Sequence, residues 1–163
     1  MKRTSAPPRS LPAAKTPRNA PNIIVRPGRI ADAGRVAELS TQLGYPSNSK
    51  EMVQRIKRLQ PASQHALFVA VQANRVIGWI GVSASRLLEV EPRAEVDGLV
   101  VDEAARSRGA GKLLLEKVEA WAKHAGCKSM SVRSNVKRER AHEFYQKNGY
   151  KHYKTQKAFR KDI

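Results

Sequence analysis

The stretch that decides the fold is Val100-Val101-Asp102-Glu103-Ala104-Ala105-Arg106-Ser107-Arg108-Gly109-Ala110-Gly111-Lys112, which leads from an apolar strand pattern through a basic turn into a long helix pattern. Gly109 and Gly111 carry no Cβ, so the backbone of this turn can come close to a ligand. The first N–H groups of a helix lack an internal partner, and with the positive end of the helix dipole they suit a pyrophosphate. The predicted anion site consists of Arg106, Ser107, Arg108, Gly109, Ala110, Gly111 and Lys112.

A basic turn with glycines is not specific by itself, because a tight turn with solvated basic residues has the same pattern. Two other phosphate motifs are absent from the sequence. There is no G-x-x-x-x-G-K-[ST] loop, and no G-x-G-x-x-G opens a dinucleotide-binding unit near the first predicted strand. The turn therefore predicts a phosphate site of another kind.

The residues on both sides of this stretch predict a mixed α/β domain. Runs rich in β-branched residues predict strands, and apolar residues three and four positions apart predict helices. The expected strands are 23–25, 66–71, 76–83, 94–101 and 129–133, followed by a terminal pair that begins at Gly149-Tyr150. The expected helices are 32–43, 48–59, 109–124 and 138–147, with Asp32 and Asn48 as the N-caps of the first two.

Length and composition are those of an ordinary globular chain. The 163 residues suffice for one domain with a core, and 40% of them are hydrophobic. No apolar run is long enough to span a bilayer, so we expect a soluble chain without a membrane partner. The single cysteine, Cys127, excludes an internal disulfide, and the four histidines show no metal-ligand spacing. We therefore expect no metal and a cytoplasmic location.

The net charge of +17 is unevenly distributed along the chain. Residues 1–21 carry five basic residues and no acidic one, so twelve of the seventeen charges belong to residues 22–163. Composition predicts a disordered basic arm at 1–21 and one folded domain at 22–163. A strongly basic protein attracts polyanions, so charge alone does not separate a phosphorylated coenzyme from a nucleic acid.

A second motif stands at Ala141-His142-Glu143-Phe144-Tyr145-Gln146-Lys147-Asn148-Gly149-Tyr150. Together with Arg106-x-x-Gly109-x-Gly111, it makes the chain resemble the GNAT superfamily of N-acetyltransferases, whose motifs are Q/R-x-x-G-x-G/A and A-x-x-F-Y-x-x-x-G-F/Y. The resemblance covers about residues 23–161. One departure is Arg138, where many members have Asn three residues before the alanine, and Asn135 is expected to make that coenzyme contact instead.

The resemblance implies a mixed, mostly antiparallel sheet of six to seven strands flanked by about four helices. It also implies an acyl-CoA-dependent N-acetyltransferase with acetyl-CoA as co-substrate. Backbone groups of Leu99, Val100 and Val101 are then expected to bind the pantetheine arm. Dimers are common in the family, so a homodimer is one option for the assembly.

Acyl transfer to an amine requires a neutral amine, a stabilised oxyanion and an acid for the departing thiolate. The resemblance implies that Tyr145 contacts the coenzyme and is the general acid, and the alternative is a core tyrosine beside Phe144. Glu95 and Asp97 alternate along a predicted strand, so both can face the cleft and relay the proton of the amine. Glu95 is the first choice, and the alternative is a solvated strand face or a salt bridge.

Two functions follow from the sequence. The first is an N-acetyltransferase that acts on a primary amine of a small cationic molecule or a protein, because an acidic cluster attracts a cationic amine. The cluster consists of Glu89, Glu91, Glu95 and Asp97. The second is a nucleic-acid-associated binding module on an acetyltransferase scaffold, suggested by the charge and the basic arm. No aromatic-basic RNA motif or helix-turn-helix signature supports a nucleic-acid partner, so this function is not favoured.

Overall fold

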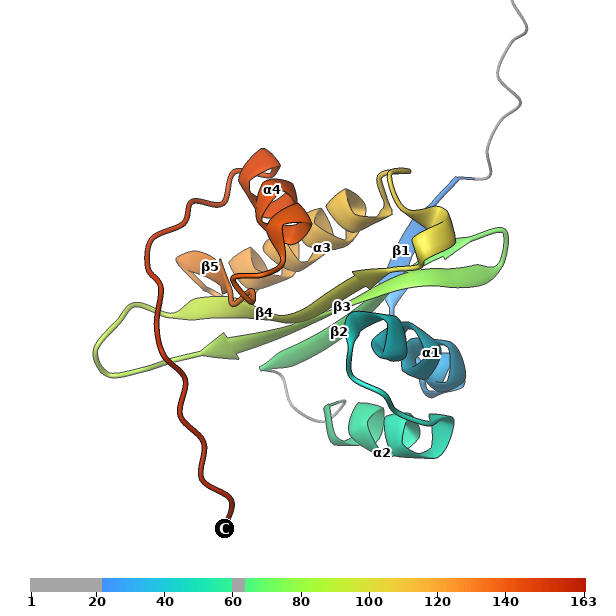
Figure 1. Cartoon of the computed structure of the whole chain (residues 1–163), viewed down its shortest axis with the longest axis horizontal. Helices are drawn as coiled ribbons and strands as arrows, with labels where there is room; N and C mark the ends of the chain where they lie inside the picture. The colour runs from blue at the N-terminus through green and yellow to red at the C-terminus, as the bar shows by residue number, and fades with distance from the viewer. Residues whose placement is uncertain (1–21, 60–63) are drawn as a thin grey trace, which may run out of the picture.

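A computed structural model describes residues 22–59 and 64–163, and the predicted basic arm lies outside this range. The described residues contain a five-stranded sheet in the order β1-β2-β3-β4-β5 (Figure 1). The strands are β1 (Ile24–Pro27), β2 (His65–Gln72), β3 (Arg75–Ser85), β4 (Arg93–Val101) and β5 (Ser129–Val132). Neighbouring strands are antiparallel except β4 and β5, which are parallel. The predicted mixed, mostly antiparallel α/β fold is confirmed.

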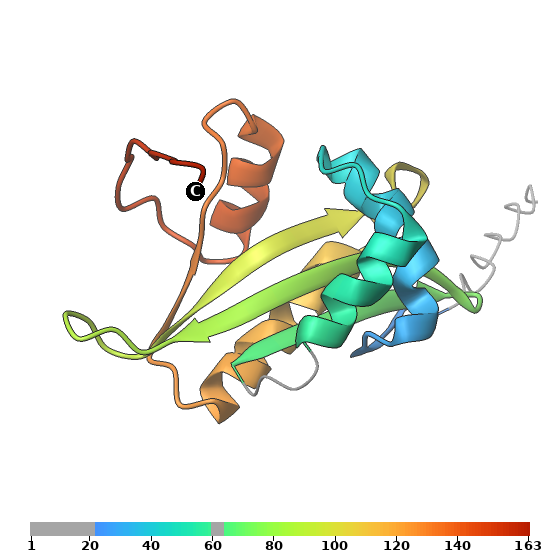
Figure 2. The same cartoon turned by 90° about the horizontal axis from the view of Figure 1, so that it is seen from below.

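Helices cover both faces of this sheet (Figures 1 and 2). The helices are α1 (Ala33–Leu43), α2 (Ser49–Leu59), α3 (Ala110–His124) and α4 (Glu139–Lys147), with short 3-10 turns η1 (Ile30–Asp32) and η2 (Glu103–Ala105). The pair α1 and α2 lies on one face, and α3 lies on the other. No helix in the described ranges is long and apolar enough to cross a bilayer.

Each face of the sheet has its own apolar core. The core on the α3 side includes Phe68, Ala70, Ile77, Ile80, Val82, Ala94, Val96, Leu114, Leu115 and Val118. The core under α1 and α2 includes Val36, Leu39, Met52, Ile56, Val69, Val76 and Val100. Burying one large side chain of this kind contributes about 1.5–3 kcal/mol, so both layers hold the sheet firmly.

Of the two N-caps predicted from the sequence, the structure contains one. The cap of α2 is present, because the Asn48 side-chain oxygen accepts a hydrogen bond from the Glu51 N–H at 2.9 Å. Asp32 precedes α1 but does not cap it with its side chain. Its carboxylate instead accepts hydrogen bonds from the Arg26 guanidinium group at 2.8 Å and from the Arg29 N–H at 2.8 Å. The strand β1 brings Arg26 to this buried carboxylate, and that pairing was not visible in the sequence.

A β-bulge divides β4 into two halves. Gly81 of β3 lies opposite Gly98, whereas the next residue, Val82, lies opposite Val96, so Asp97 is the extra residue. The bulge changes which residues face which core: Val96 belongs to the core on the α3 side, but Val100 belongs to the core under α1 and α2. Without the extra residue, an even spacing of four would leave both side chains on one face.

Within the described ranges the sheet has five strands rather than the predicted six to seven. The predicted terminal pair is absent, because residues 151–163 form no strand and are exposed throughout. This segment contains five Lys or Arg residues and no apolar alternation, so neither of its faces could be buried against a core. Its large apolar side chains, including Tyr153 and Phe159, remain in solvent.

Candidate active site

The central feature of the site is an open strand edge. Pairing between β4 and β5 ends where Val96 lies opposite Val132, although β4 continues to Val101. On the β5 side, residues 97–101 therefore have no strand partner in the described part of the chain. The helix α4, which follows β5, stands beside this half of β4 (Figure 2). An extended ligand can use the free backbone groups of such an edge in place of a strand.

The turn into α3 lies at the end of this edge. Gly109 adopts a left-handed conformation with φ 88°, and α3 begins at the next residue. The first bond of the helix runs from the Leu113 N–H to the Gly109 carbonyl at 3.1 Å. The N–H groups of Ala110, Gly111 and Lys112 therefore have no acceptor within the helix. A Cβ at Gly109 would meet no atom within 4 Å, so the space in front of the turn is open.

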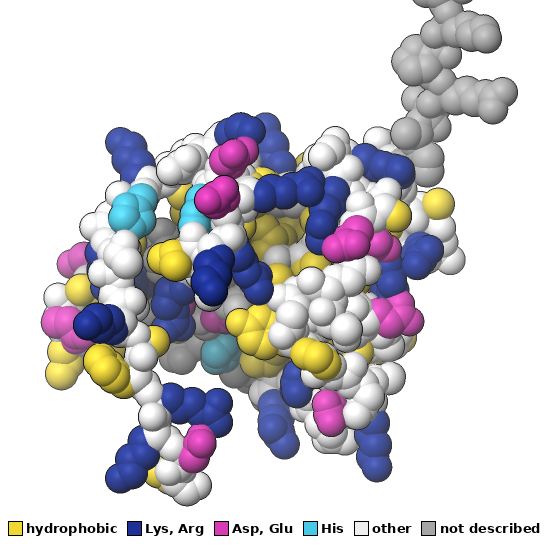
Figure 3. Space-filling view, viewed as in Figure 1, with side chains coloured by type: hydrophobic (Ala, Val, Ile, Leu, Met, Phe, Trp, Pro, Cys, Tyr) yellow, Lys and Arg dark blue, Asp and Glu magenta, His cyan; other side chains and the backbone are white. Residues whose placement is uncertain are grey.

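The basic side chains at this turn have different partners. Arg106 folds back, donating from Nε to the Val101 carbonyl at 3.3 Å and pairing with Glu103 at 3.3 Å. Lys112 pairs with Glu116 at 3.8 Å, one turn further along α3. Figure 3 shows Lys and Arg side chains around a hollow with an apolar floor on this face of the molecule. The charge and the free N–H groups fit a pyrophosphate.

Gly111 lies where α4 packs against α3. A Cβ there would lie 3.2 Å from Cε2 and 3.3 Å from Cζ of the Phe144 ring. The missing side chain therefore lets α4 pack against the start of α3. The two sequence motifs contact each other through this pair of residues.

Tyr145 is held between two aromatic rings. The ring centroids of Phe144 and Tyr150 lie 5.3 and 5.7 Å from that of Tyr145, both in edge-on geometry. Burial raises the pKa of Tyr145 to about 12, and the positive charge of Arg138 opposes this rise. Its hydroxyl group makes no hydrogen bond with any described residue. The phenol is therefore protonated at neutral pH and free to donate.

A polar row crosses the sheet at the end that α1 and α2 leave uncovered. Successive strands pair His65 with Ser83, Ser83 with Glu95, and Glu95 with Ser131. Residues paired directly across strands point to the same face, so these four side chains form one row. Asp97 joins it, because its carboxylate accepts a hydrogen bond from the Ser83 hydroxyl at 2.7 Å.

The two predicted carboxylates are close to each other but differ in surroundings. The Glu95 carboxylate forms an ion pair with Arg133. Partial burial raises the pKa of Asp97 above its ordinary value, while the bond from Ser83 lowers it and the charge of Glu95 adds to the rise. Asp97 is also the bulge residue. These surroundings favour Asp97 as a proton acceptor over Glu95, the first choice from the sequence.

The remaining predicted site residues lie around the same edge. Val100 is buried toward α1, and the carbonyl of Val101 already accepts the bond from Arg106. Asn135 lies in the turn before α4, where its side-chain oxygen accepts a hydrogen bond from the Lys137 N–H at 3.0 Å. This oxygen is therefore engaged within its own turn. Sequence reasoning missed Ser83, His65 and Arg133, because only the pairing register brings them to the carboxylates.

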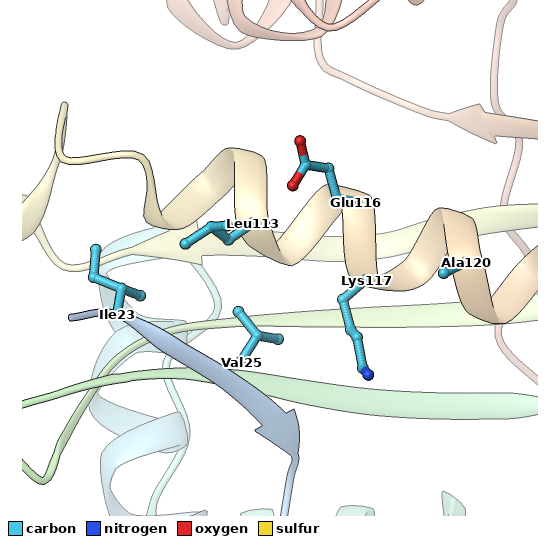
Figure 4. A pocket seen from close by; sticks show the side chains of 6 residues that line it. All are labelled: Ile23, Val25, Leu113, Glu116, Lys117 and Ala120. Carbon is cyan, nitrogen blue, oxygen red and sulfur yellow. The ribbon is translucent and has the colours of Figure 1, made fainter.

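A depression of about 290 Å³ lies elsewhere, between the start of β1 and α3 (Figure 4). It is lined by Ile23, Val25, Leu113, Glu116, Lys117 and Ala120. Its walls are mainly apolar, and Glu116 and Lys117 are its charged groups. Within the described ranges, no group of three or more His, Cys, Asp or Glu residues could hold a metal ion. The candidate active site therefore remains the open edge of β4.

Comparison with known proteins identifies the family of the chain. The model of the acetyltransferase (GNAT) family matches residues 35–150, and the chain belongs to this family. Aminoglycoside N(6')-acetyltransferase type 1 of Stenotrophomonas maltophilia is 26% identical over 133 residues, which cover 77% of this chain and 84% of that protein. The uncharacterized N-acetyltransferase YhdJ of Bacillus subtilis is 26% identical over 110 residues, covering 68% and 75% of the two chains. The predicted class of enzyme, an acyl-CoA-dependent N-acetyltransferase, is confirmed.

The fold is also that of solved structures. Aminoglycoside N-acetyltransferase AAC(6')-Iy in complex with CoA superposes with a TM-score of 0.80 at 20% sequence identity. The superposition covers 91% of this chain and 99% of that one. At this identity, the likeness establishes the fold.

Proposed function

We propose that the open edge of β4 binds acetyl-CoA, and that the acetyl group passes at the Asp97 bulge to a primary amine. The observation that carries the proposal is the course of this edge, which leads from the free N–H groups of α3 toward the bulge. The pyrophosphate is assigned to Arg106, Ser107, Arg108, Gly109, Ala110, Gly111 and Lys112. Backbone groups of Leu99, Val100 and Val101 are assigned to the pantetheine arm.

The proposed reaction forms a C–N bond and breaks the C–S bond of the thioester. Asp97 accepts the proton of the attacking amine, directly or through a water molecule. Tyr145 donates its phenolic proton to the departing sulfur, so the products are an amide and a free thiol. A phenol with a raised pKa suits this role, because it is fully protonated before the step.

The acceptor is proposed to be a small cationic amine or an amino group of a protein. The carboxylates of Glu95 and Asp97 lie at the bulge of β4 and attract a positive charge. One curated relative is named as an aminoglycoside acetyltransferase, which supports a small amine as the acceptor.

The binding assignment can be tested with a matched pair of glycines. Gly109 and Gly126 both have positive φ, 88° and 79°, and a Cβ at either would meet nothing within 4 Å. Tryptophan at either site therefore causes similar backbone strain, of order 1–2 kcal/mol. By calorimetry, Gly109→Trp should lower acetyl-CoA affinity at least tenfold, because its side chain would occupy the place of the pyrophosphate. Gly126→Trp should bind normally, and equal affinities in the two folded variants would refute the assignment.

A further inference from the structure

Arg138 connects the two helical layers across the open edge of β4. Its Nη2 donates a hydrogen bond to the Leu43 carbonyl at 2.8 Å, a contact between residues 95 positions apart. Leu43 is the last residue of α1 and packs with the core on that face. Arg138 precedes α4, whose Phe144 and Tyr145 pack with the core on the α3 side. The connection therefore crosses the edge that is proposed to bind the acetyl donor.

Both ends of this connection are held in place. A Cβ at Gly98 would lie 3.6 Å from Cδ2 of Leu43, so the end of α1 lies over the bulge of β4. At the other end, the Arg138 N–H donates to the Asn135 carbonyl at 2.9 Å, and the Arg138 carbonyl accepts from the Ala141 N–H at 2.9 Å. The backbone of Arg138 is thus fixed in the first turn of α4.

The charge of Arg138 also acts on Tyr145. Burial raises the pKa of this phenol, and the positive charge of Arg138 counteracts part of that rise. A guanidinium group has five N–H donors. Among the described residues, the side chain of Arg138 donates a hydrogen bond to Leu43 alone. The remaining donors therefore make no hydrogen bond with a described residue, and the charge of Arg138 acts on the Tyr145 hydroxyl from across the open edge.

We propose that Arg138 is a positioning residue for acyl transfer: it holds α4 against α1 and places a positive charge beside the Tyr145 hydroxyl. Negative charge develops at this point when Tyr145 gives its proton to the departing sulfur, and a nearby cation stabilises that charge. The inference rests on the proposed function, because Arg138 acts through Tyr145. It assigns a role to the residue at which the sequence departs from the family motif.

Removal of the charge is the first arm of the test. Arg138→Gln should lower kcat about tenfold, equivalent to one pKa unit in the acidity of the phenol, and leave the KM for acetyl-CoA nearly unchanged. Arg138→Lys keeps the charge and can still donate a hydrogen bond, so it should recover most of the activity. Arg140→Gln is the matched control, because Arg140 lies in the first turn of α4 and its side chain makes no hydrogen bond or ion pair with a described residue. An equal loss of kcat in Arg140→Gln would overturn the inference, since net charge alone would then explain it.

A double-mutant cycle with Tyr145→Phe is the second arm. If Arg138 acts through Tyr145, adding Arg138→Gln to Tyr145→Phe should change kcat by less than about twofold. A further tenfold loss in that background would overturn the inference and leave the proposed function standing. If Tyr145→Phe alone leaves kcat unchanged, the acid role itself fails, and the inference fails with it. Circular dichroism of each variant confirms that the fold is kept.

Discussion

The indole ring of Trp79 lies so close to Gly98 that a Cβ at this position would stand 2.8 Å from Cη2 and 3.0 Å from Cζ3. The contact joins β3 to β4 immediately after the bulge residue Asp97. Leu43, at the end of α1, approaches the same glycine. The position of the bulge is therefore fixed by a bulky ring that has little room to move.

Substitution of this glycine should damage both stability and activity. Gly98→Ala should lower the free energy of unfolding by about 1–3 kcal/mol, because the ring of Trp79 must shift. It should also lower kcat/KM, because the bulge moves with the ring. The matched control is Gly81→Ala on the opposite strand, where a Cβ would meet Trp79 at an ordinary 3.7 Å. Urea unfolding measures the stability of both variants, and an equal loss of stability in the two would contradict this account.

Loss of the Tyr145 hydroxyl should affect the chemical step. Tyr145→Phe should lower kcat about a hundredfold, within the range of general acid catalysis, with coenzyme affinity nearly intact. Tyr150→Phe is the control, because its hydroxyl donates to Glu119 at 3.1 Å and lies outside the proposed reaction. That variant should lose about 1 kcal/mol of stability and keep its turnover. Steady-state kinetics that show the same kcat in both variants would refute the acid assignment.

Substitution and pH dependence can show whether Asp97 or Glu95 is the general base. Asp97→Asn should lower kcat about a hundredfold, whereas Glu95→Gln should have a smaller effect because Arg133 already engages that carboxylate. A base is active only when ionised, so kcat/KM of the unchanged protein should rise with pH through the raised pKa of Asp97. This rise should be absent in Asp97→Asn. A larger loss in Glu95→Gln would restore the ranking made from the sequence.

The protein should lose stability in alkali as its buried tyrosines ionise. Burial raises the pKa of Tyr145 to about 12, and it also raises that of Tyr150, with the charge of Glu119 adding to the effect. The unfolded chain loses these protons near pH 10, so the folded state then binds more protons than the unfolded state. The contribution of the two tyrosines to the free energy of unfolding is therefore complete below about pH 10 and falls as the pH rises further. Thermal unfolding above about pH 10 should show this loss of stability. A decrease of stability with pH that is as steep in Tyr145→Phe as in the unchanged protein would contradict the prediction.

The sequence predicted those parts of the fold that local patterns determine. The expected strands 66–71 and 76–83 form an antiparallel hairpin, and its two-residue turn consists of Ala73 and Asn74 with φ 47° and 62°. The long helix begins directly after Gly109, because the glycine adopts the left-handed conformation that the turn needs. These features depend on neighbours in the chain, so they were visible without a structure.

Features that depend on contacts between distant residues were not visible. The pairing of Ser83 with Glu95 follows from the register of two strands, and the bulge at Asp97 shifts that register by one residue. The contact of Gly111 with Phe144 depends on how α4 docks on α3. A terminal pair of strands was expected to begin at Gly149-Tyr150, although residues 151–163 lack the apolar alternation that a strand needs.

The contact between Trp79 and the bulge gives the protein a built-in optical probe. The sequence contains two tryptophans, and Trp121 packs against the core on the α3 side, whereas Trp79 packs on the other face. The indole Nε1 of Trp79 is buried and has no hydrogen-bond partner among the described residues, so its fluorescence responds to small changes in its surroundings. A Trp121→Phe protein would emit from Trp79 alone, and titration with either reactant would follow its arrival at the bulge without any attached dye.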